Sequence, residues 1–338
     1  MGKQLKGAII GAGWFAGYHA DGWRRIPQAN IVAVADIVAD RAREFAARWN
    51  IPRAYAGAAE LLAAERPDFV DIATRPDSHL ELTRLAARHG VHVICQKPMA
   101  PTMAECEEMV KACAAAKVRL IIHENWRWQA WYREVGRLAA ANVLGKIFHV
   151  GFRMRTGDGR GPDPYGIQPY FREMPRFLIY ETAIHYLDTS RYLGGELADI
   201  FCRTARINPL IQGEDYALVQ FRFSGGAHGL IDANRISGKV PNEVAFGELR
   251  LEGDRGMAQV DGSGRVIVTI YGRDPYGWEF DGNAGYKGDS VKAFEEHAVN
   301  SLISGRPAES EGADYLRMVR AVFACYESAE TGRVIRLA

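Results

Sequence analysis

The chain has 338 residues, which at about 150 residues per domain predicts two domains. Apolar residues make up 48% and charged residues 25%, values that suit a globular protein and exclude collagen-like, disordered and disulfide-scaffold classes. The 42 Lys and Arg residues nearly balance the 41 Asp and Glu residues, so we expect neither nucleic acid nor a membrane as a partner.

The amino terminus and the cysteines favour a cytoplasmic location. No apolar run reaches the roughly 18 residues of a membrane span, and MGKQLKGAIIGAG is not typical of a secretory signal. The five cysteines are scattered and lack the close spacing of zinc or redox motifs. We therefore expect reduced thiols and a cytoplasmic protein.

Short apolar runs alternate with amphipathic stretches over residues 1–124. The runs predict buried strands and the stretches predict helices. One of these helices begins with the capping-box pair Thr102 and Glu105. This alternation predicts βαβ units and a doubly wound parallel sheet, with strands at 7–11, 31–36, 68–74, 91–95 and 118–123.

The second half of the chain has a different pattern. After a connecting helix at about 125–145, closely spaced strands with glycine-rich turns predict a large, mostly antiparallel open sheet. Helical stretches at 180–195 and at the carboxyl end complete this α+β domain. The fold class is thus α/β, with a Rossmann dinucleotide-binding domain at 1–124 and a substrate-binding and oligomerisation domain at 125–338.

Residues 156–169 fit neither pattern, because they hold four glycines and three prolines with little apolar content. Two interpretations stay open. The segment is a solvated connection, or it is a lid that closes over a ligand beside the domain junction.

The sequence GAGWFAG at 11–17 follows a predicted strand and opens a predicted helix, as a dinucleotide fingerprint must. Gly11 permits the tight turn, Gly13 lets the backbone approach the pyrophosphate, and Ala16 replaces the third glycine. Asp36 ends the second strand, where a carboxylate would bind a ribose diol. This acid favours NAD over NADP, although Arg41 lies five residues further on.

Further polar residues follow the later predicted strands, at the edge of the sheet where such folds bind ligands. They lie in TRPDSH (74–79), CQKPM (95–99) and HENWRW (123–128). From its position alone, Lys97 could equally be a surface lysine at a strand exit. An aromatic group follows, which is more often core than a ligand platform; its members are Trp126, Trp128, Trp131 and Tyr132.

In the second half, Glu181 and His185 are four residues apart in a predicted helix, so both would project from one face. A carboxylate beside an imidazole fixes its tautomer and stabilises its cation, as a general base requires. A buried structural His–Glu pair is the alternative. His185 and Asp188 have no third ligand at a suitable spacing, so we expect no metal site.

These segments together resemble the Gfo/Idh/MocA oxidoreductase family over almost the whole chain. GAGWFAGYH is similar to the family's glycine fingerprint ending in histidine, here His19, and TRPDSH to its Thr-Pro-x-x-x-His segment. CQKP resembles the Glu-Lys-Pro signature, so Lys97 falls on the catalytic lysine. ETAIHYLD resembles the Asp-x-Gly-x-His-x-x-Asp segment, so His185 falls on the catalytic histidine. Gln96 and Glu181 depart from the usual glutamate and aspartate.

The resemblance implies NAD(P)-dependent oxidation of a sugar or polyol hydroxyl, with a homodimer or homotetramer as the assembly. It implies a catalytic set of Lys97, His185 and Glu181, the last orienting the histidine. We expect the cofactor to contact Gly11, Gly13, Trp14, Phe15, Ala16, Asp36, Arg41, Thr74, Arg75, His79, Gln96, Lys97 and Asn125. Candidate substrate contacts are Lys97, Trp126, Arg127, Arg153, Tyr165, Glu181 and His185.

Within the family, IIHENWRWQAWYRE and ICQKPMAPT are similar to the bacterial D-apiose dehydrogenases, which oxidise a branched aldose to its lactone. Other readings stay open on the same fold. They are another sugar or cyclitol dehydrogenase, an NAD-dependent glycosidase, and a non-catalytic dinucleotide sensor.

Overall fold

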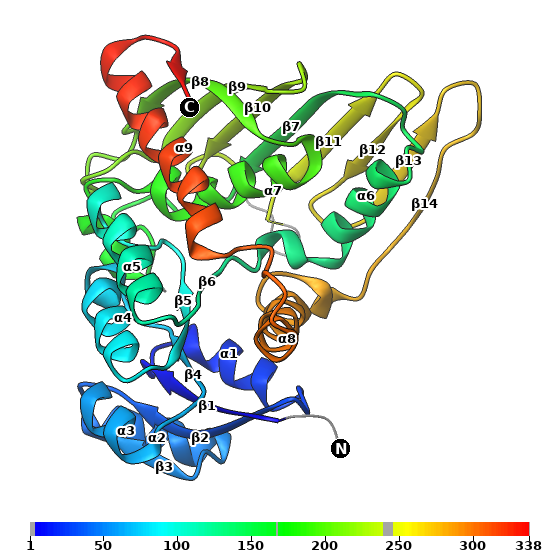
Figure 1. The fold of residues 1–338 in the computed structure, drawn as a ribbon. Helices are drawn as coiled ribbons and strands as arrows, with labels where there is room; N and C mark the ends of the chain where they lie inside the picture. The colour runs from blue at the N-terminus through cyan, green and yellow to red at the C-terminus, as the bar shows by residue number, and fades with distance from the viewer. Residues whose placement is uncertain (1–3, 167, 239–245, 338) are drawn as a thin grey trace. The chain divides into compact units, whose positions relative to one another are not determined.

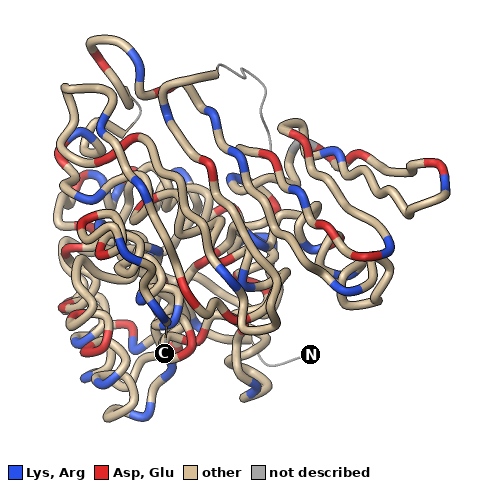
Figure 2. Tube along the Cα trace, turned by 90° about the horizontal axis from the view of Figure 1, so that it is seen from above, with Lys and Arg blue, Asp and Glu red and all other residues tan. Residues whose placement is uncertain are grey.

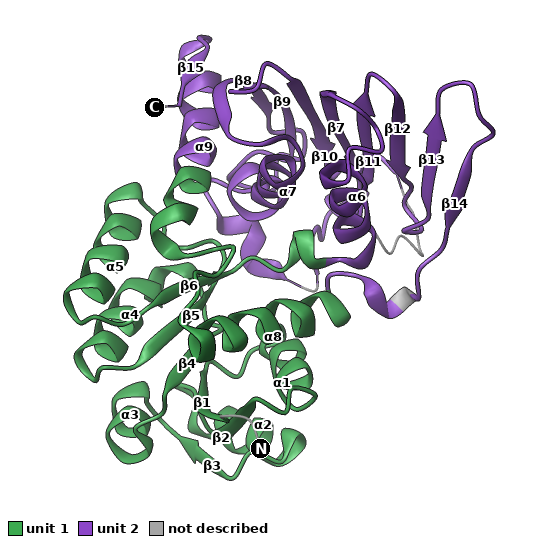
Figure 3. Ribbon diagram, turned by 45° about the vertical axis from the view of Figure 1, so that its right-hand side comes forward, with its two compact units in different colours: residues 1–128, 287–319 green, residues 129–286, 320–338 purple. Residues whose placement is uncertain are grey.

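The computed structural model describes residues 4–166, 168–238 and 246–337, and the chain forms two compact units (Figures 1 and 3). Unit 1 contains the chain up to residue 128 together with residues 287–319, and unit 2 contains residues 129–286 and 320–338. A single cut in the sequence does not separate the units, because residues 287–319 return to the first.

Unit 1 is built on a six-stranded parallel sheet of order β3-β2-β1-β4-β5-β6, which confirms the predicted doubly wound architecture. Its strands are β1 (Leu5–Ile10), β2 (Ala29–Ala35), β3 (Arg53–Tyr55), β4 (Phe69–Ile72), β5 (His92–Gln96) and β6 (Leu120–His123). Its helices are α1 (Ala16–Trp23), α2 (Ala39–Trp49), α3 (Ala58–Glu65), α4 (His79–Arg88), α5 (Met103–Ala115), α8 (Asp289–Ser304) and the first part of α9 (Gly312–Thr331).

Apart from β3 at its edge, the parallel strands of unit 1 are mostly buried, as expected where helices cover both faces of a sheet. Helix α8 adds Phe294 to the core formed by Ile9, Val34 and Phe69. Strand β3 escaped prediction because it has three residues, none of them buried. The capping box of α5 is confirmed, since the Glu105 N–H donates to Thr102 Oγ1 at 3.2 Å.

Unit 2 contains a nine-stranded sheet of order β14-β13-β12-β11-β7-β10-β9-β8-β15. Only β7 and β10 pair in parallel among its described strands, which confirms a mostly antiparallel sheet. The strands are β7 (Ile147–Arg155), β8 (Leu197–Ala205), β9 (Tyr216–Phe223), β10 (His228–Asn234), β11 (Glu248–Gly253), β12 (Gly256–Val260), β13 (Val266–Ile270), β14 (Tyr276–Trp278) and β15 (Ile335–Arg336).

Helices α6 (Ala130–Ala140), α7 (Ile184–Gly194) and the second part of α9 lie over one face of this sheet (Figure 3). Phe152 of β7 packs on Tyr186 of α7, with 5.0 Å between the ring centroids, so the even-numbered residues of β7 face these helices. The odd-numbered Arg153 points to the opposite face, where it pairs with Glu248 at 3.5 Å. A second cross-strand pair joins Arg222 to Asp199 at 2.6 Å.

Basic and acidic residues are interspersed along the chain (Figure 2). This mixture agrees with the near-zero net charge. None of the helices in the described part of the chain is both long and apolar enough to cross a membrane.

The stretch expected to be one helix over 180–195 begins differently. Residues Leu178–Ala183 form a π-helical turn, and the α-helix starts only at Ile184. Glu181 therefore lies on the π-helical turn and His185 on α7, rather than on one regular helix. Such wide turns often occur at functional sites.

Candidate active site

The glycine turn after β1 has the backbone geometry that its sequence predicts. Gly11 has φ +103°, and a side chain there would meet the Ala73 carbonyl oxygen at 2.7 Å, so both the conformation and the space require glycine. Gly13 faces open space, since no atom lies within 4 Å of the position a Cβ would take. A hollow of about 410 Å³ borders this turn and is lined in part by Gly13, Trp14 and Tyr18.

Asp36 directly follows β2 and binds the same turn. Its Oδ2 accepts the Ala12 N–H at 2.9 Å and its Oδ1 accepts the Val38 N–H at 2.9 Å. Arg41 approaches Oδ1 at 3.4 Å. The open backbone at Gly13, the start of α1 at Ala16 and an anchored carboxylate fit the pyrophosphate and ribose of a dinucleotide.

Lys97 follows the end of β5, and its neighbours hold its backbone from both sides. Its N–H donates to Oε1 of Gln96 at 2.7 Å. On the other side, Nδ1 of His79 lies 3.1 Å from the carbonyl oxygens of both Pro98 and Met99. The Lys97–Pro98 peptide bond is cis.

Several of the predicted cofactor contacts that follow β4 and β6 form hydrogen bonds with other residues of unit 1. The hydroxyls of Thr74 and Ser78 lie 2.7 Å apart, and Nε2 of His79 lies 3.1 Å from the Thr74 carbonyl oxygen. His79 is fully buried, and burial lowers its pKa. Asn125 donates to Ser290 Oγ of α8 at 2.9 Å, whereas Arg75 is exposed.

Two candidate substrate contacts of unit 1 lie inside it. Trp126 is buried, and its backbone N–H donates to Glu124 Oε1 at 3.0 Å. Arg127 is also buried and donates to the Glu309 carbonyl oxygen at 2.7 Å, which ties the end of unit 1 to the segment between α8 and α9. Their part in substrate binding stays a prediction.

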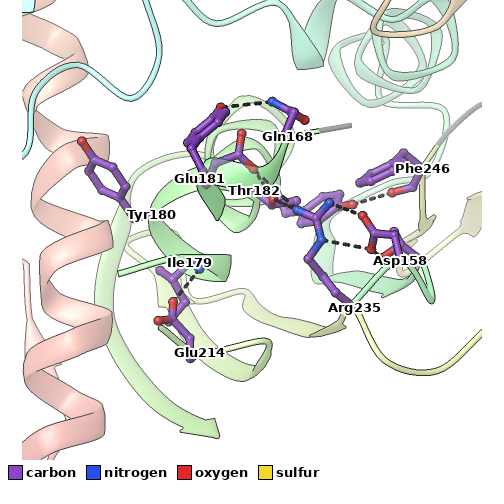
Figure 4. A network of polar contacts seen from close by, with 12 residues as sticks. Asp158, Gln168, Ile179, Tyr180, Glu181, Thr182, Glu214, Arg235 and Phe246 are labelled. Carbon is purple, nitrogen blue, oxygen red and sulfur yellow. Dashed lines mark hydrogen bonds and ion pairs between the residues drawn. The ribbon is translucent and has the colours of Figure 1, made fainter. Parts of the chain in front are cut away.

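In unit 2, a carboxylate orders the turn that carries Glu181. Glu214 accepts the N–H group of Ile179 at 2.9 Å (Figure 4). It also accepts the N–H group of Phe177 at 3.1 Å and the Tyr326 hydroxyl at 2.7 Å. Together these bonds satisfy the start of the π-helical turn. His185, on the first turn of α7, is 5% exposed.

Arg235, which follows β10, links Glu181 to the segment 156–169. Its guanidinium donates to both oxygens of Asp158, at 3.1 and 2.5 Å, and to Thr182 Oγ1 at 3.2 Å (Figure 4). The Thr182 hydroxyl in turn donates to Glu181 Oε2 at 2.6 Å, and Arg235 lies 3.8 Å from the same oxygen. Burial disfavours the charged guanidinium, but the carboxylates of Asp158 and Glu181 outweigh burial and raise the pKa of Arg235.

Aromatic rings surround the Arg235 guanidinium, whose carbon lies 5.0 to 5.1 Å from the ring centroids of Tyr165, Phe171 and Phe177. Tyr165 is 5% exposed, and burial raises its pKa. The segment 156–169 is further held by the Gly159 N–H, which donates to the Arg235 carbonyl at 2.8 Å. These contacts hold Asp158, Gly159 and Tyr165, whereas residues 160–163 are exposed, so the solvated connection and the lid both stay predictions.

The predicted substrate residues of unit 2 are therefore not all brought together. Glu181 and Tyr165 both lie around Arg235, and His185 follows on α7. Arg153 projects from the sheet face opposite the helices, away from α7. The structure does not bring it to the other three.

Unit 1 also buries a cluster of ionisable groups. Glu295 Oε1 lies 3.8 Å from both His19 Nδ1 and His123 Nε2, and all three side chains are fully buried. The two imidazole rings stack, with centroids 4.0 Å apart and an angle of 26° between their planes. Ring nitrogens donate lone pairs in the ring plane, so two stacked imidazoles do not converge well on one metal ion.

Burial keeps two members of this cluster uncharged. It raises the pKa of Glu295 well above its ordinary value, and the charge of Asp71 adds to this effect. It lowers the pKa of His123 well below its ordinary value. A protonated Glu295 and a neutral His123 follow from the complete burial of both side chains.

The sequence analysis missed Asp71, Glu295 and Arg235. Asp71 offered a signal, because an acid inside an apolar strand must find buried donors. Arg235 and Glu295 offered none, since only tertiary packing shows that they are buried.

The fold and the glycine turn define a dinucleotide-binding oxidoreductase. Residues 5–124 match the model of the oxidoreductase family with an NAD-binding Rossmann fold, and residues 132–259 match the GFO/IDH/MocA C-terminal domain. The chain belongs to the Gfo/Idh/MocA family of NAD(P)-dependent oxidoreductases, which confirms the resemblance seen in its motifs.

Two curated relatives are similar over nearly the whole chain. The D-apiose dehydrogenase of Paraburkholderia graminis is 35% identical over 99% of this chain and 90% of its own length. The D-apiose dehydrogenase of Rhizobium rhizogenes is 33% identical over 98% and 97%. Among solved structures, an oxidoreductase from Agrobacterium radiobacter in complex with NAD+, L-tartaric acid and magnesium has a TM-score of 0.92 and 32% identity, covering 99% of both chains.

Replacing Glu295 by Gln should flatten the dependence of stability on pH. In the wild type, the folded state keeps a proton on Glu295 that the unfolded state releases near pH 4.5, so the free energy of unfolding falls as pH rises above that value. Glu295→Gln removes this loss, and its melting temperature relative to wild type should rise from pH 5 to pH 9. Glu296→Gln, a partly exposed neighbour paired with Lys292, is the matched control. Parallel pH curves for wild type and Glu295→Gln would contradict the assignment.

Replacing Asp158 by Asn should destabilise unit 2, because the buried Arg235 loses its main anionic partner. We expect a loss of about 1 to 2 kcal/mol in chemical denaturation, less than for a fully buried pair, since the Asp158 side chain is 40% exposed. Asp163→Asn, in the same segment but with a side chain that is 75% exposed, should change stability little. Equal effects of the two substitutions would argue against a stabilising contact between Asp158 and Arg235.

Proposed function

We propose that this protein is an NAD-dependent sugar dehydrogenase that oxidises D-apiose to its lactone. The observation that carries the proposal is the full-length similarity to two D-apiose dehydrogenases, together with Lys97, Glu181 and His185 at the expected motif positions. A sugar is a small neutral ligand, in agreement with the balanced charge of the chain.

Each of the three motif residues has its own role in the proposed chemistry. Bound NAD supplies the hydride acceptor, held by the glycine turn and by Asp36. His185 removes the proton from the anomeric hydroxyl as the C–H hydride leaves and the C=O bond of the lactone forms. Lys97 provides positive charge where alkoxide character develops on the same oxygen. Glu181, held by Thr182 and Arg235, is a positioning residue that orients His185 and stabilises its cation.

The surroundings of Asp36 support NAD rather than NADP as the cofactor. Two backbone N–H groups hold the carboxylate in place, so it would stand against the 2′-phosphate of NADP and accept the 2′-hydroxyl of NAD. Arg41 already pairs with this carboxylate at 3.4 Å, which leaves less of its charge for a phosphate.

We further propose a homodimer or homotetramer that works in the cytoplasm. The sheet face opposite the helices is a broad surface with paired charges such as Arg222 and Asp199, which suits self-association. All five cysteines are buried and unbridged, as expected for a reducing compartment.

The function is tested with purified protein, NAD or NADP, and a panel of aldoses and cyclitols that includes D-apiose, followed by absorbance at 340 nm. We expect NADH with D-apiose, and product analysis should identify the lactone. NADH formed with inositol instead would assign a cyclitol dehydrogenase. No NADH from any sugar, together with cleavage of a chromogenic glycoside, would assign a glycosidase and overturn the proposal.

Asp36→Asn should relax cofactor choice, because it removes the anion but keeps an acceptor for the Ala12 N–H. We expect the ratio of kcat/KM for NAD over NADP to fall by roughly 10-fold or more. Asp40→Asn is the control, since that carboxylate is exposed and pairs with Arg43. An unchanged ratio would show that another group selects the cofactor.

A further inference from the structure

A chain of hydrogen bonds joins buried side chains of β5, α1 and β4 in unit 1. The donors along it all point from β5 towards β4. Asp71 Oδ2 accepts the indole N–H of Trp23 at 2.6 Å and lies 2.8 Å from His19 Nδ1. An indole nitrogen is only a donor, so this oxygen is an acceptor. The proton of His19 therefore lies on Nδ1, facing the carboxylate.

The other end of the chain of bonds requires the same tautomer. Gln96 Oε1 accepts the N–H of Lys97 at 2.7 Å, so the amide nitrogen of Gln96 points the other way. That nitrogen lies 2.9 Å from His19 Nε2. Because the amide nitrogen can only donate, His19 Nε2 must be an unprotonated acceptor, and the ring is neutral.

The groups around His19 are compatible with a neutral ring. His123 of β6 stacks on it, and Glu295 of α8 approaches Nδ1 at 3.8 Å. Both are uncharged in the core, as shown above. Asp71 of β4 is the adjacent anion, and the nearest charges beyond Glu295 are those of Asp21 and Arg25 on and just beyond α1.

We infer that His19 is a positioning residue for Lys97. Its Nε2 accepts the amide N–H of Gln96, which fixes the rotamer of the Gln96 side chain. Gln96 in turn accepts the backbone N–H of Lys97 and so holds the backbone that carries the Lys97 side chain. The inference rests on the proposed function, in which Lys97 acts on the substrate. It also explains the departure from the Glu-Lys-Pro signature.

The residue type at position 96 and the protonation of His19 are coupled. A glutamate there would place a carboxylate oxygen against the lone pair of His19 Nε2, and the two would repel unless His19 took up a second proton. Glutamine needs no such proton. A glutamine at position 96 thus goes together with a neutral His19, whereas a glutamate would require a protonated one.

The first experiment needs no substrate. Histidine is labelled with ¹⁵N in the whole protein, and the His19 resonances are assigned among the nine histidines by their loss in His19→Gln. At pH 7 we expect a neutral ring with the proton on Nδ1 in wild type and a doubly protonated ring in Gln96→Glu. A cationic His19, or a proton on Nε2, in wild type would overturn the inference.

The second experiment separates positioning from folding. His19→Leu should lower kcat with D-apiose by roughly 10- to 100-fold, with the Kd of NAD changed less than about 3-fold. His19→Gln, which restores an acceptor for Gln96, should recover part of the loss. His89→Leu, at an exposed histidine after α4, is the matched control and should keep full activity.

Lys97→Ala distinguishes the inference from the function on which it rests. If Lys97→Ala loses turnover and His19→Leu added to it lowers kcat no further, the two residues act as one unit. If Lys97→Ala is inactive but His19→Leu keeps full kcat, the positioning role fails alone. If Lys97→Ala keeps kcat, the proposed chemistry fails first. Should His19→Leu not fold, Gln96→Glu carries the test through the first experiment, because a neutral His19 ring in that variant would overturn the inference.

Discussion

The burial of one carboxylate organises the part of unit 1 around the glycine turn. Asp71 lies in the middle of a parallel sheet without exposure to solvent, so its charge requires N–H donors. Trp23 and His19 of α1 both donate to its Oδ2. The requirement fixes α1 against β4, and with it the glycine turn that opens α1. Gln96 lies 2.9 Å from His19 and accepts the N–H of Lys97, so the same requirement extends to the backbone of Lys97.

Unit 2 solves the corresponding problem with a buried cation. Arg235 is excluded from water, so it needs both carboxylates and ring faces around it. Asp158 comes from the segment 156–169 and Glu181 from the π-helical turn, and one guanidinium therefore orders two irregular stretches. Asp158, Gly159 and Tyr165 of this glycine- and proline-rich segment are therefore held, although its composition alone is typical of a solvated loop.

Local patterns predicted most of the fold, because period and turn chemistry act over a few residues. The glycine turn at Gly11, the capping box at Thr102 and the alternation of strands and helices in unit 1 are all of this kind. The return of residues 287–319 to unit 1 is not, since α8 has no local feature that selects its partner. Sequence spacing also treated Glu181 and His185 as one α-helix, because a π-helical turn has no distinct period in so short a stretch.

The sequence predicted the placement of some candidate site residues better than that of others. Gly11 and Asp36 follow from backbone geometry at the end of a strand, which βαβ topology largely determines. Arg153 and Arg127 were chosen for proximity to a predicted junction, and side-chain direction decides such cases. Arg153 points to the far face of its sheet, and Arg127 donates to the Glu309 carbonyl. Proximity along the chain indicates a neighbourhood but not a direction.

The two units manage charge in opposite ways, and the difference suits the roles proposed for them. In unit 1, glutamine replaces glutamate before Lys97, His19 is neutral and Glu295 is protonated, so the anion of this network is Asp71, whose Oδ2 accepts the N–H groups of His19 and Trp23. Unit 2 instead keeps the carboxylate of Glu181 3.8 Å from the buried guanidinium of Arg235. In the proposed chemistry this carboxylate balances the positive charge that His185 gains as a base. The glutamine at position 96 therefore goes with a neutral His19, and the carboxylate at position 181 goes with a cation.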